Sequence, residues 1–200
     1  MARRGIGTRE RLIDAALATL NDHGFAGTTA RAIAVAAGTN QALIYYHFGG
    51  VDRLLVAALE ATSRDRLARY RVALSEAASL PELIAAMVGL YSEDVATGHV
   101  TAVQELVAGG SSVPGLRKEI VAQMEPWFAY AEEVLGRFLA GTPVETVLPI
   151  KEMALAGVAM YLGIETLTTL DGDRSKADAL FDLAMRLAPL ADSFLQSARP

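Results

Sequence analysis

Apolar residues recur along most of this chain at the three- and four-residue spacings of amphipathic helices. The first repeat lies on one helical face and consists of Leu12, Ile13, Ala16, Leu17 and Leu20. Thr8 is placed to cap this helix and Gly24 to end it. No stretch shows the period-two alternation of a strand, and no segment repeats. The pattern therefore predicts an all-α fold.

The next helices follow from the same spacing and from residues that start or stop helices. We expect a second helix over 30–37, a third that Asn40 caps, and a longer fourth helix from about Val51 to about Ala77. Ser79-Leu80-Pro81-Glu82 is a capping box with proline in the first turn, so a new helix begins there. We place the main domain boundary at this capping box.

Five helices are expected after the boundary. They should end near Thr97, Ala108, Leu139, Leu170 and Leu195. The loop GGSSVPG at 109–115 should separate the second of them from the third, and Pro126 should kink the third. A second capping box, Thr142-Pro143-Val144-Glu145, should begin the fourth.

The stretch TNQALIYYHFGG at 39–50 contains no Asp, Glu, Lys or Arg and spans barely two helical turns. A helix this short is not stable alone in water, so neighbouring helices must hold it. Gly38 can supply the left-handed backbone of a tight turn before it, and Ala34 is small enough to let two helices cross closely. Two short helices joined by such a turn, behind a supporting first helix, form a helix-turn-helix.

The spacing divides this short helix into an inward and an outward face. Ile44 and Phe48 should face inward. Their expected partners are Leu17, Leu20, Phe25 and Ile33. The outward face consists of Gln41, Ala42, Tyr45 and Tyr46. Because the second helix of such motifs lies in the DNA major groove with its N-terminal residues at base edges, this face predicts DNA recognition.

Positive charge is concentrated in the first 75 residues. Ten arginines and six acids give this part +4, whereas the whole chain carries −5. A basic N-terminal part on an acidic remainder indicates a polyanionic partner for the first part only. We expect the arginine cluster at 64–71 to be a solvated helix face rather than a DNA contact.

Composition argues against several other classes of protein. Without cysteine there is no disulfide framework or thiolate metal site, and His23, His47 and His99 share no helical face, so no metal or cofactor is expected. The N-terminus lacks an apolar signal core, and the uncharged run 153–164 is shorter than the roughly 20 residues of a membrane helix, which favours a cytoplasmic protein without a membrane partner. No catalytic motif is visible, and a helical ligand-processing enzyme would leave the basic helix-turn-helix unexplained.

The stretch TTARAIAVAAGTNQALIYYHFGGVDRLL at 28–55 resembles the N-terminal signature of the tetracycline-repressor (TetR/AcrR) family of bacterial regulators. The resemblance covers about Thr8 to Leu59, and the rest of the chain is similar only in architecture. It implies a three-helix DNA-binding domain followed by a helical ligand-binding and dimerisation domain, with about nine helices. The corresponding domains are 1–50, a connecting fourth helix at 51–78, and 79–200.

This resemblance implies a homodimeric repressor that a small, largely apolar molecule releases from a palindromic double-stranded DNA operator. We expect the effector to act through the fourth helix and to weaken operator binding roughly 5–150-fold. The residues expected at DNA are Thr29 and Arg31 for the backbone and adjacent bases, Asn40, Gln41 and Ala42 for base edges, and Tyr45, Tyr46 and His47 for phosphates. Arg3, Arg4 and Arg9 could add phosphate or minor-groove contacts. An activator, or a ligand sensor that does not bind DNA, stays open.

Family members enclose their ligand in the helices after the boundary. The candidate ligand-binding residues here are Met87, Tyr91, Val103, Gln104, Met124, Trp127, Phe128 and Tyr130. Pro126 frees a backbone carbonyl beside Trp127 that a ligand could use, and Tyr91 or Tyr130 could offer a hydroxyl group. Core packing is the alternative for any one of these residues.

Dimerisation is expected to use the last two helices, in a four-helix contact with a symmetry mate. The candidate interface residues are Ala154, Gly157, Val158, Tyr161, Ile164, Leu180, Leu183, Leu187 and Phe194. Packing within the chain would take some of these positions.

One position departs from the family pattern. Family members usually carry a lysine at the start of the fourth helix, where its ammonium meets a DNA phosphate, and Val51 stands there in this chain. Either Val51 packs under the turn and Arg53 takes the phosphate, or the contact is absent. We expect it to be absent, because Arg53 lies about 200° further round the helix. Val51→Lys is then expected to tighten operator binding and to steepen its salt dependence.

Overall fold

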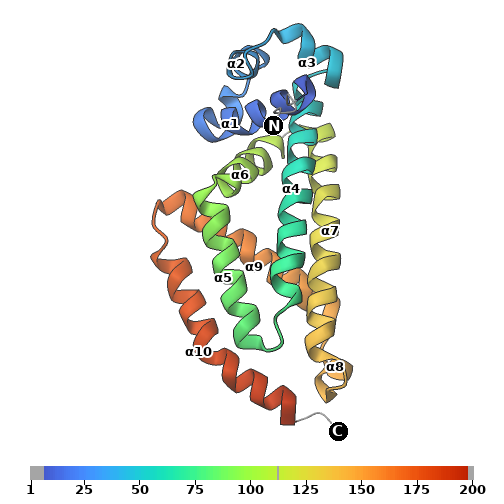
Figure 1. Ribbon diagram of the computed structural model, residues 1–200, viewed down its shortest axis with the longest axis vertical. Helices are drawn as coiled ribbons and strands as arrows, with labels where there is room; N and C mark the ends of the chain where they lie inside the picture. Colours follow the sequence, from blue (N-terminus) through green and yellow to red (C-terminus); the bar gives the residue numbers. More distant parts are fainter. Residues whose placement is uncertain (1–6, 112, 198–200) are drawn as a thin grey trace, which may run out of the picture. The chain divides into compact units, whose positions relative to one another are not determined.

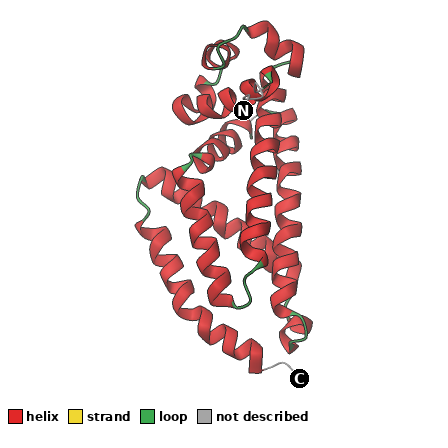
Figure 2. Cartoon of the chain, viewed as in Figure 1, coloured by secondary structure: helices red, strands yellow, loops and turns green. Residues whose placement is uncertain are grey.

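The computed structural model describes residues 7–111 and 113–197, and within these ranges the chain forms ten helices and no strand (Figure 1, Figure 2). The helices are α1 (Thr8–Gly27), α2 (Ala30–Ala36), α3 (Gln41–Phe48), α4 (Val51–Ser75), α5 (Leu80–Ala96), α6 (His99–Gly110), α7 (Pro114–Leu139), α8 (Pro143–Val147), α9 (Ile150–Asp171) and α10 (Ser175–Ser197). The predicted all-α fold is confirmed.

The chain folds as two compact units, each built from separate stretches of sequence. The first unit consists of residues 1–66 and 95–123, and the second of residues 67–94 and 124–200. Helices α4 and α7 each contribute residues to both units. These units differ from the domains expected at 1–50, 51–78 and 79–200, because a helix boundary such as the capping box before α5 need not separate two packing units.

In the first unit, α1, α2 and α3 pack around one apolar core. Leu12, Ile33 and Ile44 are fully buried in it, together with Leu54 from α4. Helix α1 contacts both α2 and α6. The core thus holds α3 in place, which explains how a helix of eight residues can form.

Helix α6 is joined to the end of α1 within this unit. The Glu105 carboxylate accepts a hydrogen bond from the backbone N–H of Phe25 at 2.9 Å. Gly24 breaks the helical backbone just before this point, with φ 67°, so the predicted stop at Gly24 is present although α1 continues to Gly27. A Cβ at Gly109 would lie 2.1 Å from the Phe25 ring, so only glycine allows α6 to come this close. These contacts place α6 with the helix-turn-helix.

The second unit has its own core, formed by Tyr70, Leu74, Leu83, Leu90, Tyr130 and Phe138. Beside it lies Asp94, whose side chain is completely buried. The Asp94 carboxylate accepts hydrogen bonds from Arg69 at 2.9 Å and from the Tyr70 hydroxyl at 3.0 Å. A buried carboxylate is tolerated here because its charge is paired and its oxygens are hydrogen-bonded.

Three helix boundaries differ from the sequence-based expectation. Gly7, not Thr8, precedes the first turn of α1, and its N–H donates to the Glu10 carboxylate at 2.9 Å. The expected loop at 109–115 is shorter, because α6 continues through Gly110. The helix predicted from Thr142 is divided into α8 and α9. Pro149 disfavours a helical conformation of the residue before it, and that residue has φ −94° and ψ 128°.

Helix α9 contains the most apolar run of the chain. It is 22 residues long with a mean hydropathy of 1.4 over its most apolar stretch, and only 17% of that stretch is buried. By length and composition it could cross a membrane, although the sequence analysis judged the uncharged run too short. A single helix of this kind is weak evidence, because an exposed apolar face that packs against another protein chain has the same composition.

Candidate nucleic-acid interface

The turn between α2 and α3 has the geometry that the sequence predicts. The Thr29 hydroxyl accepts from the N–H of Ala32 at 3.2 Å and begins α2. Gly38 adopts a left-handed backbone, with φ 61°, in the turn. The Asn40 carboxamide oxygen accepts from the N–H of Leu43 at 3.2 Å and caps α3. Two short helices are therefore joined by a tight turn with a cap at each start.

Helix α3 buries one face and exposes the other. Ile44 and Phe48 are buried in the core of the first unit. Gln41 and Ala42 are exposed, as are Tyr45 and Tyr46. His47 is half-buried, and its ring packs edge-on against Tyr46 with the ring centres 5.0 Å apart. The division into an inward and an outward face is confirmed, whereas contacts of these residues with DNA remain predictions.

Three exposed arginines of the first unit, Arg9, Arg31 and Arg53, form no ion pair within the part of the chain that the structure describes. Their guanidinium groups are therefore available to a polyanion. Arg3 and Arg4, for which we expect DNA contacts, lie outside the described residues. The unpaired arginines agree with the positive charge of the N-terminal part of the chain.

Arg53 lies close to the turn after α3, whereas the expected absence of a phosphate contact at this turn stays a prediction. Its Nη1 atom lies 3.4 Å from the position that a Cβ would occupy at Gly49. Side chains on a helix lean toward its N-terminus, so Arg53 covers the residue four positions before it rather than the face of Val51. Val51 itself packs partly buried against the core. The packing of Val51 agrees with one part of the first alternative, and the phosphate contact of Arg53 in that alternative stays a prediction.

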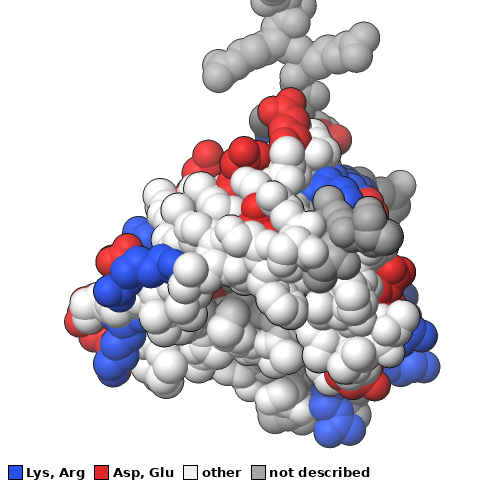
Figure 3. Space-filling view, turned by 90° about the horizontal axis from the view of Figure 1, so that it is seen from below, with Lys and Arg blue, Asp and Glu red and all other residues white. Residues whose placement is uncertain are grey.

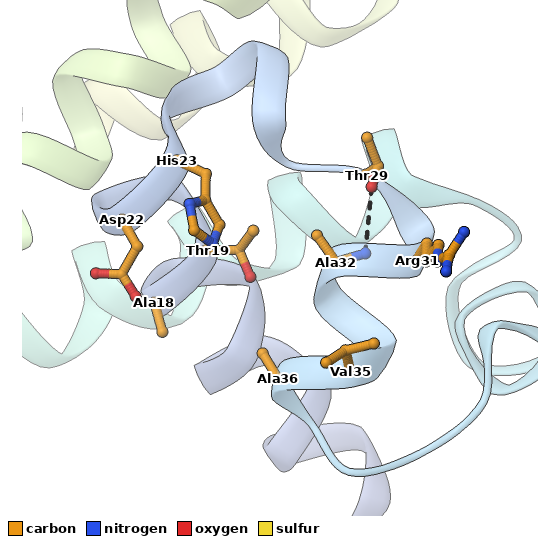
Figure 4. A pocket seen from close by; sticks show the side chains of 9 residues that line it. All are labelled: Ala18, Thr19, Asp22, His23, Thr29, Arg31, Ala32, Val35 and Ala36. Atoms are coloured by element: carbon orange, nitrogen blue, oxygen red, sulfur yellow. Dashed lines mark hydrogen bonds between the residues drawn. The ribbon is translucent and has the colours of Figure 1, made fainter.

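A cavity of about 400 Å³ lies between α1 and α2 (Figure 4). It is lined by Ala18, Thr19, Asp22, His23, Thr29, Arg31, Ala32, Val35 and Ala36. Figure 4 shows the first four of these residues on α1 and the others on or just before α2. None of the predicted ligand-binding residues lines this cavity, which instead adjoins two predicted DNA contacts, Thr29 and Arg31.

The arginine cluster at 64–71 is only in part the solvated face that the sequence suggested, since the Arg64 side chain is 71% exposed. Arg66 is buried. Arg69 pairs with Glu93 at 3.2 Å as well as with Asp94. Arg71 pairs with Glu133 at 2.7 Å and lies over a tyrosine ring. Arg69 and Arg71 are therefore engaged in ion pairs within the chain, and the expectation that the cluster does not contact DNA stays a prediction.

Two of the predicted ligand-binding residues are packed into the second unit. Tyr91 is fully buried, and its hydroxyl lies 3.0 Å from that of Thr168. Tyr130 is buried, and its hydroxyl donates to the backbone carbonyl of Tyr70 at 3.0 Å. Burial raises the pKa of Tyr130 above its usual value of 10, so the hydroxyl stays protonated as this donor bond requires. The Tyr130 hydroxyl therefore uses its proton within the chain, whereas either oxygen of the Tyr91–Thr168 pair could be the donor.

The remaining predicted ligand-binding residues are distributed over both units. Val103 and Gln104 belong to the first unit, and Val103 is buried in its core. The second unit contains Met87, Met124, Trp127 and Phe128, each half-buried. Trp127 packs edge-on against Tyr70 with ring centres 5.1 Å apart. These residues keep their candidate role as a prediction.

The last two helices expose many large apolar side chains. Those exposed on α9 are Leu155, Met160, Leu167 and Leu170, and those on α10 are Leu183, Met185, Leu187, Leu190 and Phe194. Figure 3 shows one face of the molecule, on which uncharged residues cover a broad area between scattered charged groups. Exposed apolar side chains in this number on two neighbouring helices are typical of a protein–protein interface.

Three of the predicted dimer residues lie inside the chain instead. Ala154 and Ile164 are buried. Tyr161 is half-buried, with its hydroxyl 2.9 Å from that of Tyr70. They occupy the side of α9 that packs within its own unit, and their role in a dimer stays a prediction. Gly157, Leu183, Leu187 and Phe194 are exposed, and Val158 and Leu180 are half-buried.

The sequence did not predict the contacts between elements that position the candidate residues. The Glu105 contact with α1 and the position of Arg9 over the Phe48 ring join segments far apart in sequence. Only the four-residue separation of Gly49 and Arg53 could have been recognised beforehand. Among the described residues, no group of three or more His, Asp or Glu side chains could hold a metal ion.

An exposed, uncharged α3 held behind a tight turn by α1 and α2 defines a helix-turn-helix DNA-binding protein. Residues 12–58 match the model of the family described as bacterial regulatory proteins, tetR family. This match confirms, for the N-terminal part of the chain, the resemblance to the TetR family that the sequence indicated. Its members and the relatives reported below are regulators of transcription rather than enzymes.

A curated relative of similar sequence is the HTH-type transcriptional regulator BetI of Brucella abortus, 35% identical over 82 residues. The match covers 41% of this chain and 41% of that protein, so the chain spans less than half the length of this relative.

Solved structures are similar over almost the whole chain. The fatty acid degradation regulator FadR from Bacillus halodurans has a TM-score of 0.76 at 20% identity, with 93% of this chain and 96% of that chain covered. The multidrug binding protein EbrR, complexed with imidazole, has a TM-score of 0.64 at 25% identity, with 92% and 96% covered. The first of these similarities shows that the fold extends beyond the helix-turn-helix.

Proposed function

We propose that this protein is a homodimeric transcriptional repressor of the cytoplasm, which a small, largely apolar molecule releases from a palindromic DNA operator. Its DNA-binding part is the helix-turn-helix of the first unit. Its ligand-binding and dimerisation surfaces belong to the helices that follow. The family match over residues 12–58 and the similarity of the whole fold to known regulators support this assignment.

The exposed face of α3 is the observation on which the proposal rests. Gln41 and Ala42 lie in its first turn, where a recognition helix meets base edges. A glutamine side chain can form two hydrogen bonds to adenine, and an alanine methyl can contact the thymine methyl. Tyr45 and Tyr46 extend from the same helix with exposed fractions of 56% and 80%. A tyrosine with so much exposed area contributes little to packing, but its hydroxyl can contact phosphate.

Dimerisation through α9 and α10 is supported by their exposed apolar residues. The two helices contact each other within the second unit. Leu183, Leu187, Leu190 and Phe194 follow one another at spacings of three and four, so they form one stripe along α10. Burying this stripe against its symmetry copy would remove it from water, and a two-fold axis would present two α3 helices to the two halves of a palindrome.

A small, largely apolar effector is supported by the nature of the candidate residues and by one neighbour. EbrR is described as a multidrug binding protein and is 25% identical to this chain. Met87, Trp127 and Phe128 are partly buried side chains that suit an apolar ligand. The effector would weaken operator binding roughly 5–150-fold, the usual range of coupling between two sites.

A footprinting experiment on the DNA upstream of the protein's own gene tests the proposal. We expect protection of a near-palindromic site whose half-sites are roughly 34–36 Å apart, one helical turn of DNA. A Gln41→Ala/Tyr45→Ala variant should lose this footprint and keep its thermal stability, since both side chains are exposed. Protection by the variant equal to that by the wild type would contradict the role of α3, and protection by neither would contradict DNA binding.

A further inference from the structure

One threonine hydroxyl of the first unit is buried without a hydrogen-bond partner. Thr62, on α4, is 4% exposed, and its Oγ1 atom forms no hydrogen bond within the described part of the chain. Thr62 follows Ala58 by four residues and Leu59 by three, so it lies on the face of α4 that packs into the core of this unit. Buried polar groups in native proteins nearly always have a partner, so this hydroxyl requires an explanation.

Other threonines of the chain show how a helix ordinarily satisfies such a hydroxyl. Thr19 is also buried, and its hydroxyl donates to the backbone carbonyl of Ala15, four residues earlier, at 2.6 Å. Thr28 donates in the same way to the carbonyl of Gly24 at 2.6 Å. A helical threonine can point its hydroxyl toward such a carbonyl or away from it, because two χ1 rotamers are accessible to it. The Thr62 side chain adopts an arrangement in which no backbone carbonyl accepts its proton.

We propose that Thr62 donates a hydrogen bond to a carbonyl oxygen of the effector, and that the effector is a neutral, largely apolar carbonyl compound. The inference rests on the proposed function, because it names the chemical class of the molecule that releases the protein from DNA. Unpaired buried donors are rarer in proteins than acceptors with unused lone pairs. The group that completes this hydroxyl is therefore first of all an acceptor.

The surroundings of Thr62 favour a neutral acceptor over an ionised one. Ala58 and Leu59 are buried in the core of the first unit, and Ala61 packs partly buried against it. An ionised ligand group beside these apolar side chains would lose its hydration without a counter-charge, which is far more costly than burying a hydrogen-bonded carbonyl. The same core contains Val103, for which the sequence predicted a ligand contact. The new site thus adjoins one residue of the expected ligand-binding set.

Two further polar side chains are buried on the same stretch of α4. They are Ser63 and Arg66, and both already take part in interactions within the chain. Arg66 lies one turn after Thr62, and a guanidinium group has donors only, so a ligand group near both residues has to accept hydrogen bonds. Because Arg66 is already engaged, a neutral carbonyl suits this place better than a carboxylate.

Three ligands that share a long apolar chain and differ in their polar group test the proposal. They are methyl octyl ketone, decanoate and decylammonium, and their binding to the full-length protein would be measured by isothermal titration calorimetry. Thr62→Val replaces the hydroxyl by a methyl group of similar size. Thr19→Val is the matched control, because Thr19 is 3% exposed and its hydroxyl is bonded within its own helix.

The wild type should bind methyl octyl ketone roughly tenfold or more tightly than either ionised ligand, because the ionised groups lose their hydration. Thr62→Val should weaken the binding of the ketone about 2- to 12-fold, the contribution of one hydrogen bond, and leave the binding of the other two ligands unchanged. Thr19→Val should keep the wild-type affinity. In infrared spectra, the carbonyl stretch of the bound ketone should lie at lower frequency in the wild type than in Thr62→Val.

Thermal melting without ligand separates the site from a structural role. Thr62→Val should melt at the wild-type temperature or above it, because the substitution removes a buried polar group that has no partner. Thr19→Val should melt at a lower temperature, because its hydroxyl loses a hydrogen bond. A Thr62→Val protein as destabilised as Thr19→Val would show that the Thr62 hydroxyl has an acceptor within the protein, and this would overturn the proposal.

The binding data can also overturn the proposal. Equal affinity of the wild type and Thr62→Val for the ketone would exclude the hydrogen bond and assign the hydroxyl a water molecule as its partner. Tighter binding of decanoate or decylammonium, or no binding of the ketone to the wild type, would exclude the neutral class. The proposed function fails separately. A wild type that binds the ketone but protects no DNA in the footprinting experiment would contradict the repressor function and leave the contact at Thr62 in place.

Discussion

Different side chains of α3 serve different purposes. One face of this helix packs against the core, and the other face is exposed to solvent. Ile44 is fully buried, and the Asn40 side chain caps the first turn. Neither residue competes with Gln41 for the outward face. The neighbouring residues thus position the Gln41 side chain, whose amide would be free to read a base in the proposed complex with DNA.

Gln41→Ala is expected to reduce sequence discrimination without affecting the fold. A bidentate contact between glutamine and adenine contributes about 1–3 kcal/mol of discrimination against the wrong base. The ratio of operator affinity to random-duplex affinity should therefore fall roughly 5- to 150-fold in a competition assay. The random-duplex affinity itself is the internal control and should not change. An unaltered ratio would show that Gln41 does not contact a base.

Glycine at position 109 allows α6 to approach α1. A Cβ there would meet the Phe25 ring at 2.1 Å, so Gly109→Ala should lower the free energy of unfolding by about 1–3 kcal/mol through overpacking. Gly89→Ala on α5 is the matched control, because nothing lies within 4 Å of its Cβ position. That control should gain about 0.5–1 kcal/mol from helix propensity. Urea denaturation of both variants measures the difference, and equal effects would contradict the close approach.

At the scale of elements, the pairing of α1 with α6 links the helix-turn-helix to a helix from the middle of the chain. Phe25 follows the break in α1 at Gly24, where its N–H has no helical acceptor. The Glu105 carboxylate supplies that acceptor from α6. A side chain of α6 therefore accepts the hydrogen bond from a backbone N–H of α1 that has no acceptor within its own helix.

Glu105→Ala should destabilise the first unit by about 1–3 kcal/mol, because the half-buried N–H of Phe25 loses its partner. Glu105→Gln retains a carbonyl oxygen at the same position and should lose less. Chemical denaturation followed by circular dichroism compares the two variants. If Glu105→Gln is as destabilised as Glu105→Ala, the charge rather than the hydrogen bond stabilises this contact.

At the scale of the whole molecule, the apolar stripe on α10 is exposed among the described residues. Leu190 and Phe194 have exposed fractions of 70% and 62%. Exposed residues of this size are unfavourable in a monomer, since each leaves apolar area in contact with water. A second copy of the chain is the partner that the proposed function requires.

Leu190→Asp is expected to prevent dimerisation, because a carboxylate would be buried in the apolar contact without a partner. Light scattering at micromolar concentration should give the mass of two chains for the wild type and of one chain for the variant. Val72→Asp is the matched control, since Val72 on α4 is also 70% exposed but lies outside α9 and α10. A wild-type monomer would refute the proposed interface, and so would a Leu190→Asp dimer.

The sequence by itself determined the features that depend on local spacing. The helical periodicity, the cap at Asn40 and the glycine turn at Gly38 all appear in the structure as predicted, because each depends on residues within one or two turns. The inward positions of Ile44 and Phe48 were predictable for the same reason. The family resemblance was likewise confined to this contiguous stretch.

Only the tertiary structure decided which helix packs against which. A helix such as α9 has apolar residues on more than one side, and periodicity alone does not tell which side meets its own chain. Ala154 and Ile164 are therefore buried in the second unit, whereas Leu155 and Leu167 are exposed. The attachment of α6 to α1 and the reach of Arg53 over Gly49 depend on contacts between elements and on side-chain direction, which the three-dimensional packing sets.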